Sequence, residues 1–514
     1  MRQLTELDAS FLNRESAKAP MHIESIYLFD ASEQETPLAF SSFAAYLRSR
    51  LHALPVFRQR LKEIPLRLGR PYWIDDAHFR LERHLAHVRL SENSREASLM
   101  TLASRILEEP LKRDRPLWHI TFVDGFRLDD RNSNDKAGPE GFALIVKLHH
   151  AAIDAFSGEE IISKLLEYTQ EPQPISPPRP WQSRPEPSEE RILIQAGANM
   201  LRTPWRFASS AAGAIETKVR SLIQKQLLKT PLPGPLFSAS HSPLSRQITA
   251  NRHIISVKIK LSRLKAVKAT LAGNITLNDV VLGLCAETLK RYLNEQRAGS
   301  GQSLIAMTPI SVRSDTLRRT TGNQMAAMLL DLATNEPDPA LRIYRIHSNA
   351  VASRPYRDAI AADRLTELLP SSMLALSARL YSELQISKRY RPAFNLPITN
   401  VPGPQVPLYL RGAKLAQQYN AAPLFDGMGL VIIAVSYQGS LTLNFTLCPD
   451  VVVRGDSLRN HVNESLEAIV DAASALKPEV VHTPFTTPRS QTPTDDEKSL
   501  PESALKKPKG RFRR

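Results

Sequence analysis

Two adjacent histidines, His149 and His150, and an aspartate four residues after the second, Asp154, carry the side chains best suited to chemistry in this sequence. They follow a largely apolar run, Phe142–Leu148, which predicts a buried strand. Imidazole has an unperturbed pKa near neutrality, so it can take up a proton and return it. A carboxylate one short loop away can hold the local geometry. The stretch therefore indicates a proton-transfer site at the end of a strand.

Two other interpretations of the histidine pair are a structural role for both rings and a metal site. A single histidine at a strand end is more often structural, but a tandem pair followed by an aspartate favours a functional site. Adjacent residues of an extended chain point to opposite faces, so His149 and His150 cannot easily share one ion. The sequence also has no Cys-x-x-Cys or His-Glu-x-x-His motif. We therefore predict one structural histidine, one catalytic histidine and no metal.

The elements that must position these residues alternate between strands and helices over residues 1–168. Ser157 and Glu160 fit a capping box, which predicts a helix directly after the Asp154 loop. The apolar patterns upstream predict strands at 21–29, 71–76 and 119–124 and helices at 43–51 and 97–108. This alternation predicts an N-terminal domain of the α+β or mixed α/β class.

The rest of the chain divides into three segments by composition. Residues 169–245 begin with a proline-rich linker and continue with a stretch, 190–228, that mixes basic with apolar and aromatic residues. That mixture suits an interfacial helix at a lipid surface, and equally a packed helix with a solvated basic face. Residues 246–478 again alternate strand and helix patterns, with a turn-rich loop at 394–404, and predict a second domain. Residues 479–514 predict a disordered basic tail.

Composition and charge limit the class of protein. The chain has 514 residues, enough for two or three domains, and its two cysteines, Cys285 and Cys448, form no disulfide framework, which suggests a reducing compartment. The N-terminus has no apolar signal core, and no run reaches the roughly 18–20 apolar residues that span a bilayer. A net charge of +15 suits phospholipid surfaces or phosphate-bearing substrates. Nucleic acid is the least supported partner, since no zinc finger or RNA-recognition motif is present.

Several short motifs accompany the histidine pair. They are Pro116-Leu117-Trp118, His149-His150-x-x-x-Asp154, Asn278-Asp279, Gly322-Asn323, Asn400-Val-Pro-Gly-Pro404 and Gly427-Met-Gly-Leu430. With these motifs in this order, residues 1 to about 475 resemble the bacterial wax ester synthase/acyl-CoA:diacylglycerol acyltransferases. These belong to a superfamily of CoA-dependent acyltransferases that share an HHxxxDG motif. The chain departs from that motif at one position, where the family's glycine is Ala155.

The resemblance implies two similar domains of chloramphenicol acetyltransferase type with a central tunnel between them. It also implies an acyl-CoA-dependent O-acyltransferase in which His150 is the general base. The ring removes the proton of the acceptor hydroxyl as this attacks the thioester, and the imidazolium then protonates the departing CoA thiolate. His149 is expected to support it, and Asp154 to orient the loop and the ring. Acyl-CoA is the co-substrate, the acceptor is diacylglycerol or a long-chain alcohol, and no cofactor is expected.

Further candidate residues lie elsewhere in the chain. Asn278 is a candidate donor to the thioester oxygen, where negative charge develops, because its amide can donate and the carboxylate of Asp279 cannot. Both residues also suit a helix N-terminus, as does Thr276, so capping is the competing interpretation. The segment Pro116-Leu117-Trp118 predicts a turn with a buried aromatic anchor. These three residues, Asp279 and Ala155 are further candidates for substrate binding.

Two other functions stay open beside this one. One is a related acyltransferase with another alcohol or amine acceptor, and the other is a lipid-surface binding protein without turnover. The intact His150 and Asp154 argue against the second. Because diacylglycerol and fatty alcohols lie in membranes or lipid droplets, we expect a cytoplasmic protein in peripheral contact with the inner face of the membrane or with droplets. Residues 190–228 and the basic surface would make that contact. A second copy of the chain is a further candidate partner.

Overall fold

The computed structural model describes residues 2–65, 69–128, 139–155, 164–172, 174, 181–194, 239–297, 301–311, 325–353 and 392–476. Within the compact unit Met1–Ala475, the described strands form two six-stranded sheets and one three-stranded sheet. The first six-stranded sheet holds the histidine strand, and the second lies wholly in the C-terminal half of the chain.

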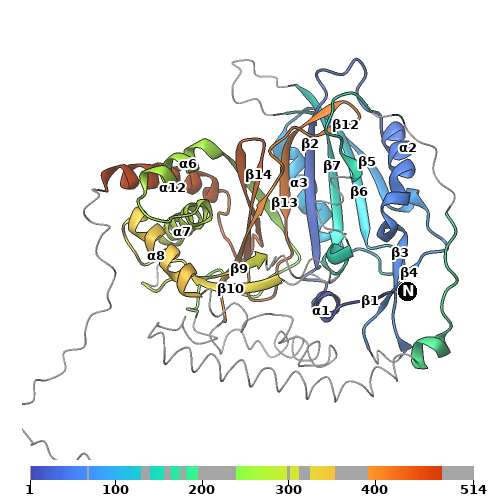
Figure 1. Cartoon of the computed structure of the whole chain (residues 1–514), viewed down its shortest axis with the longest axis horizontal. Helices are drawn as coiled ribbons and strands as arrows, with labels where there is room; N and C mark the ends of the chain where they lie inside the picture. The colour runs from blue at the N-terminus through green and yellow to red at the C-terminus, as the bar shows by residue number, and fades with distance from the viewer. Residues whose placement is uncertain are drawn as a thin grey trace, which may run out of the picture. The chain divides into compact units, whose positions relative to one another are not determined.

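The histidine strand, β7, lies inside the first sheet (Figure 1). The order of this sheet is β12 (Tyr409–Leu410), β13 (Ala413–Ala421), β2 (His22–Asp30), β7 (Glu140–His149), β6 (Trp118–Arg127) and β5 (Leu85–Ser94). β7 pairs antiparallel with β2 on one side and with β6 on the other, so its backbone is anchored from both sides. β13 pairs antiparallel with β2. Two strands of the C-terminal half therefore complete a sheet of the N-terminal half.

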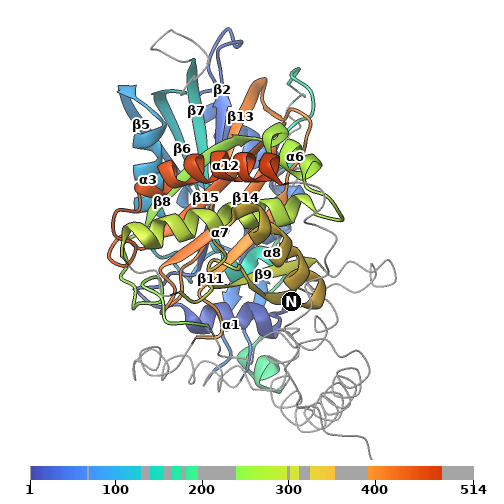
Figure 2. The ribbon, with the colours of Figure 1, turned by 90° about the vertical axis from the view of Figure 1, so that its left-hand side faces the viewer.

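The second sheet carries helices on one face. Its order is β10 (Met325–Asp331), β9 (Ile305–Ser311), β11 (Leu396–Pro402), β14 (Leu430–Tyr437), β15 (Ser440–Leu447) and β8 (His253–Lys260). β11 is parallel to both neighbours, and the other pairs are antiparallel. The covering helices are α6 (Leu261–Thr270), α7 (Leu277–Glu295), α8 (Pro339–Ser353) and α12 (Ser457–Ala475), of which α7 and α12 lie side by side (Figure 2).

The N-terminal segment lies beside the end of the histidine strand. Strand β1 (Arg2–Gln3) pairs with β4 (Tyr72–Asp75), and β4 pairs with β3 (Gln59–Lys62). Helix α1 (Glu6–Arg14) then contacts η5, the 3-10 segment His150–Ala155 that follows β7. The remaining described elements of this half are α2 (Phe40–Arg50), α3 (Glu96–Glu108), η1 (Leu51–Ala53), η2 (Pro55–Arg58) and η4 (Leu81–Arg83).

Two hydrophobic cores fill the two faces of the first sheet. Side chains alternate along each strand, so Phe29 and Leu144 join the core with α2, whereas Ile26 and Ile145 join the core with α3. The second core also includes Ile254 of β8. Helix α3 therefore joins the two sheets.

Hydrogen bonds reinforce the junction at α3. The backbone N–H of Ile254 donates to Ser104 Oγ at 3.1 Å, and the N–H of Arg252 donates to Glu108 Oε1 at 2.8 Å. Both acceptors lie on α3, and both donors lie at the start of β8. These two hydrogen bonds from α3 thus fix the position at which β8 of the second sheet begins.

The mixed α/β architecture predicted from the sequence is confirmed, and so are the strands expected near residues 21–29 and 119–124. The loop predicted at 394–404 is wrong over Leu396–Pro402, which forms β11 between β9 and β14. Its prolines, Pro397 and Pro402, stand near the two ends of the strand, where a missing N–H costs little.

Several sequence-based predictions lie outside the described residues. They concern the helix after Ser157, the Gly322-Asn323 pair, residues 195–228 and the tail at 479–514. The domain boundaries at 168, 245 and 478 stay predictions. Within the described ranges, every helix is too short or too polar to cross a membrane.

Candidate active site

The two adjacent histidines leave the sheet in different directions. His149 is the last residue of β7, and His150 begins η5. The backbone N–H of His149 donates to Leu117 O at 3.1 Å, whereas the N–H of His150 donates to Met21 O at 2.7 Å. One neighbour precedes β6 and the other precedes β2, so the chain is held from both sides at the turn. The two rings accordingly enter different surroundings, as the adjacency of the residues predicts.

His149 is the buried member of the pair, with only 1% of its surface exposed. Its Nδ1 accepts the backbone N–H of Ala151 at 3.0 Å, and its Nε2 lies 3.4 Å from Glu15 Oε1. The ring also meets His22 edge to face, with centroids 5.6 Å apart. These contacts fix the ring in place, which fits the supporting role expected for it.

His150 is only partly buried, and its imidazole stacks on the ring of Phe11. Burial, with a smaller contribution from the neighbouring His149, lowers the pKa of His150 to about 3. The ring is therefore neutral at physiological pH, which is the form that can accept a proton. Its Nδ1 is buried and has no hydrogen-bond partner among the described residues.

A carboxylate and two histidines lie close enough to raise the question of a metal. Ligand atoms of Glu15, His22 and His149 all lie within 4.8 Å of one another. However, the N–H of Leu111 donates to His22 Nε2 at 3.3 Å, and the guanidinium of Arg113 donates to Glu15 Oε2 at 2.6 Å. These donors occupy lone pairs that an ion needs and already supply a positive charge. The set fits a hydrogen-bonded network better than a cation site.

The same face of the sheet continues into a second buried polar pair. Glu24 and Lys147 lie opposite each other in the β2–β7 register, and their exposed fractions are 0% and 4%. The ammonium of Lys147 donates to Ile106 O at 2.6 Å and to Glu109 O at 2.8 Å, at the C-terminal end of α3. A cation there complements the free carbonyls of the helix end, so this lysine serves to hold α3.

Asp154 and Ala155 are the last two residues of η5, the segment that begins with His150. The placement of their side chains lies outside the described part of the structure. The orienting role of Asp154 and the effect of Ala155 in place of glycine therefore stay predictions.

The segment Pro116-Leu117-Trp118 forms the turn and buried anchor that its sequence predicts. Trp118 is 1% exposed, and its Nε1 donates to Phe57 O at 2.9 Å. Its indole stacks between the rings of Phe57 and His84, at centroid distances of 4.3 and 4.6 Å. Because Leu117 O accepts the N–H of the first histidine, this anchor also fixes the end of β7. Substrate contact by the three residues stays a prediction.

The candidate residues of the second half lie at the start of α7. Thr276 is the N-cap, and Asp279 completes a capping box and pairs with His347 Nδ1 at 2.8 Å, so capping explains both residues. Asn278 is exposed, and its Oδ1 accepts from Asn400 Nδ2 at 2.9 Å. Two motifs far apart in the chain thus meet at one hydrogen bond. The side-chain N–H₂ of Asn278 stays free to donate within the described residues.

Four residues near the histidines were not singled out as functional from the sequence: Phe11, Glu15, His22 and Arg113. They come from α1, from the loop after it, from β2 and from the segment before β6. Nothing in their local spacing brings them together. The antiparallel pairing of β2 with β7 places His22 opposite His149, more than a hundred positions away in the sequence. Contacts of α1 and of the loops place the other three.

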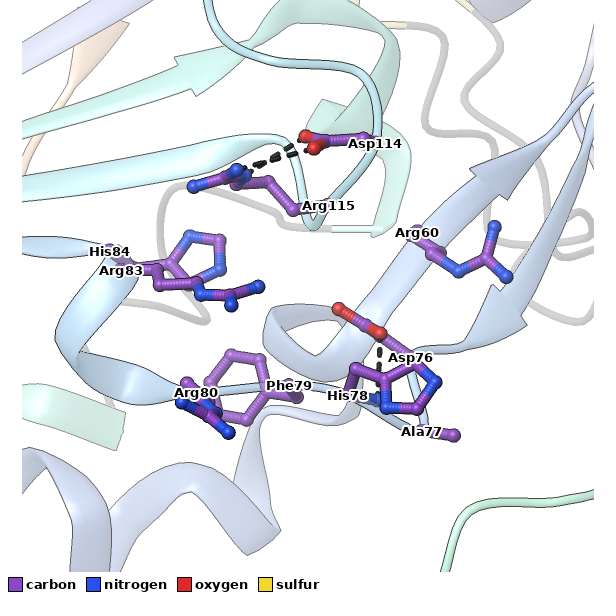
Figure 3. Close-up of a pocket in the computed structure, with 10 residues that line it drawn as sticks. All are labelled: Arg60, Asp76, Ala77, His78, Phe79, Arg80, Arg83, His84, Asp114 and Arg115. Atoms are coloured by element: carbon purple, nitrogen blue, oxygen red, sulfur yellow. Dashed lines mark hydrogen bonds and ion pairs between the residues drawn. The ribbon is translucent and has the colours of Figure 1, made fainter.

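A separate cavity of about 570 Å³ is lined in part by His84 (Figure 3), the residue that stacks on Trp118. The neighbouring residues Asp114 and Arg115 form an ion pair at 2.9 Å, whereas Arg80 and Arg83 have no carboxylate partner among the described residues. The lining consists of Arg60, Asp76, Ala77, His78, Phe79, Arg80, Arg83, His84, Asp114 and Arg115. With more guanidinium groups than carboxylates, the cavity is positively charged, and neither histidine of the pair lines it.

Solved structures share this architecture. The wax ester synthase/diacylglycerol acyltransferase of Marinobacter aquaeolei VT8 superposes with a TM-score of 0.65 at 23% identity, covering 91% of this chain and 99% of that one. The starter condensation domain of rhizomide synthetase, solved with C8-CoA and Leu-SNAC, superposes with a TM-score of 0.51 at 13% identity, covering 93% and 96%. At these identities the likeness establishes the fold.

Sequence comparisons are more specific. A probable diacylglycerol O-acyltransferase of Mycobacterium tuberculosis is 31% identical over 476 residues, which cover 90% of this chain and 98% of that protein. The O-acyltransferase WSD of Acinetobacter baylyi is 28% identical over 478 residues, covering 91% and 96%. The model of the wax ester synthase/diacylglycerol acyltransferase catalytic domain matches residues 4–281, and that of the WS/DGAT C-terminal domain matches residues 321–470. The chain therefore belongs to the wax ester synthase/diacylglycerol acyltransferase family of acyltransferases.

Proposed function

We propose that this protein transfers a long-chain acyl group from acyl-CoA to the hydroxyl of diacylglycerol, of a long-chain alcohol, or of both. The observation that carries the proposal is the neutral, partly accessible imidazole of His150 at the end of β7, within the segment that matches the family's catalytic domain. The names of the relatives, a diacylglycerol O-acyltransferase and an O-acyltransferase, support the same class of acceptor.

In the proposed reaction His150 removes the proton of the acceptor hydroxyl while the oxygen attacks the thioester carbonyl. The carbon–sulfur bond then breaks, and the imidazolium returns the proton to the CoA thiolate. General base catalysis of this kind contributes roughly 10²–10⁴-fold. A ring whose pKa lies near 3 is a weak base but a strong acid once protonated. Its low pKa therefore favours protonation of the leaving thiolate, the second half of the cycle.

Asn278 is the proposed donor to the oxygen on which negative charge develops. Support comes from its place at the exposed N-terminus of α7 and from its free amide N–H₂ group, while its amide oxygen is engaged by Asn400. Asp154 is proposed to orient the η5 loop, since it lies on that loop four residues after the base.

The test is a substrate profile of the purified protein with radiolabelled acyl-CoA. Diacylglycerol, a series of long-chain alcohols and one long-chain amine are offered in parallel. We expect ester products, and we expect His150→Ala to lower turnover by roughly 10²–10⁴-fold. His87→Ala, at a half-exposed histidine paired with Asp124 on another strand, is the matched control and keeps its activity. Near-normal turnover of His150→Ala would overturn the assignment of His150 as the base. Amide products without any ester would show that the acceptor is an amine.

We infer further that the protein meets its lipid substrates by peripheral contact. Leu193 and Ile194 are 38% and 74% exposed at the start of the basic and apolar stretch, and Arg80 and Arg83 add unpaired positive charge. At low salt we expect binding to vesicles with anionic headgroups and little binding to zwitterionic ones.

Two charge variants test that contact. The double variant Arg80→Gln/Arg83→Gln is expected to weaken binding to anionic vesicles. Lys265→Gln/Lys268→Gln, on the exposed side of α6, removes the same charge elsewhere and serves as the control. A full-length protein that stays in solution with anionic vesicles at low salt contradicts the proposal.

A further inference from the structure

We propose that Glu15 is a positioning residue for the transfer reaction, acting through His149 and Met21 on the backbone that carries His150. The inference rests on the proposed function, in which His150 is the base. Glu15 is the C-cap residue of α1, and it faces the end of β7. Its effect passes through two routes, a close approach to the His149 ring and a hydrogen bond from the backbone of Met21.

The carboxylate of Glu15 is itself held rigidly. Its Oε2 accepts from Arg113 Nε at 3.0 Å and from Nη2 at 2.6 Å, and that guanidinium also donates to Leu12 O at 2.8 Å. Burial alone would raise the pKa of Glu15, but the contacts with the two buried histidines and Arg113 outweigh it and hold the pKa well below its ordinary value. The group is therefore an ionised acceptor with a fixed orientation.

The first route runs through the tautomer of His149. Because His149 Nδ1 accepts the N–H of Ala151, the neutral ring must carry its proton on Nε2. His149 Nε2 lies 3.4 Å from Glu15 Oε1, and this carboxylate oxygen is the acceptor that faces it. Without the carboxylate the Nε2–H group would be left without an acceptor, and the opposite tautomer would break the bond to Ala151. Glu15 thus selects the tautomer that ties down the first turn of η5.

The second route runs through Met21. The backbone N–H of Met21 donates to Glu15 Oε1 at 3.5 Å, and Met21 O accepts the N–H of His150 at 2.7 Å. One carboxylate oxygen therefore lies behind both anchors of this segment. Met21 accepts the N–H of His150, and the His149 ring accepts the N–H of the next residue, Ala151. A shift of about 1 Å in such a group can cost 10²-fold in rate.

A purely structural role predicts a different outcome for two replacements of similar size. Glu15→Gln keeps an oxygen that can accept from His149 Nε2, whereas Glu15→Met keeps the volume and removes the acceptor. Both lose the charge that faces Arg113. If the carboxylate only balances that guanidinium, the two variants lose activity alike. If it positions His149, Glu15→Met loses about 10- to 100-fold in kcat with little change in KM, and Glu15→Gln is the milder variant.

A double-mutant cycle tests the route through the ring. In His149→Asn the amide oxygen can take the place of Nδ1 as acceptor for Ala151, and no ring proton remains for Glu15 to accept. Adding Glu15→Met to this background should therefore lower kcat much less than it does in the wild type. An additive effect overturns the proposal. Glu63→Gln is the control, since its carboxylate lies 3.9 Å from Arg113 on the opposite, exposed side.

A spectroscopic arm needs no turnover. Nitrogen-15 spectra of the full chain labelled at histidine report which ring nitrogen carries the proton, and His149→Asn identifies the His149 signals by their loss. The wild type should show the Nε2–H form, and Glu15→Met a mixture or the Nδ1–H form. An unchanged tautomer in a folded Glu15→Met overturns the inference. If the wild type has no activity on any acceptor, the proposed function is wrong. The tautomer measured for His149 still decides the role of Glu15 in that case.

Discussion

The phenyl ring of Phe11 lies against the imidazole of His150, with centroids 3.7 Å apart and an angle of 21° between the planes. Phe11 belongs to α1, and the histidine begins η5, so the N-terminal helix covers the proposed base. This contact removes water from one face of the imidazole. Burial is the main cause of the low pKa of His150, and Phe11 contributes to that burial through the stacked contact.

Replacing Phe11 by alanine should therefore move the pH dependence of the reaction. Exposing the ring to water favours its protonated form, so the pKa of His150 rises from about 3 toward its ordinary value. The acid limb of kcat/KM, which reports the free enzyme, should move to higher pH. Phe11→Leu keeps an apolar cover and should move the limb less. Identical pH profiles in the three proteins would show that the stack does not set the pKa.

Acid should destabilise the protein through the buried histidines. Burial lowers the pKa of His22 to about 4. Between pH 4 and 6.5 this histidine is therefore protonated in the unfolded chain and neutral in the folded one. The neutral His22 thus contributes to the free energy of unfolding. This contribution is fully present above pH 6.5 and falls by about 2 kcal/mol between pH 7 and pH 5. The facing carboxylate of Glu15 stays ionised over this range.

Urea unfolding at the two pH values measures this loss of His22 stability. The variant His22→Gln removes one titrating group and should make the dependence shallower, while the lowered pKa of His150 keeps part of it. A wild type with the same free energy of unfolding at pH 5 and pH 7 would contradict the expectation.

Changes at Trp118 should act on stability. Trp118→Phe keeps a ring between its two stacking partners but removes the hydrogen bond that Nε1 donates to Phe57 O, at a cost of about 0.5–1.5 kcal/mol. Trp118→Ala also opens a cavity and should cost about 3–5 kcal/mol. Chemical unfolding gives both values. A larger loss of kcat than of stability in Trp118→Phe would instead favour a role at the substrate.

The start of α7 offers a matched pair of substitutions. Thr276→Ala removes the capping hydroxyl and should cost about 0.5–2 kcal/mol of stability while kcat is retained. Asn278→Ala, two residues further on, removes no capping bond among the described contacts and should lower kcat while thermal stability is kept. If Asn278→Ala loses stability and activity in proportion, the donor role proposed for this residue is wrong.

Much of the fold follows from local sequence patterns. The apolar run before His149 predicts β7, and the spacing of apolar residues predicts α3 and α7, because each element is amphipathic or buried over its whole length. The strand at Leu396–Pro402 was missed because its prolines signal turns, whereas the parallel neighbours β9 and β14 decide its conformation.

The candidate site was only partly predictable for a related reason. The histidine pair and Asp154 stand close together in the sequence, so their spacing indicates chemistry directly. Glu15, His22 and Arg113 reach the first histidine through strand pairing and a loop contact, and none of them has a local signature. Capping by Thr276 and Asp279 was the competing interpretation from the sequence, because both residue types are common at helix N-termini.

The placement of β13 has a consequence for the folding of the chain. A fragment that ends at residue 245 lacks this strand, so β2 would present an open row of N–H and C=O groups to solvent, a template for self-association. The two halves should then behave as complementing fragments, with each insoluble or unstable alone and restored when the missing strand is supplied in trans. The first sheet is therefore incomplete until residue 421 has been synthesised, and the histidine strand β7 lies next but one to β13 in that sheet.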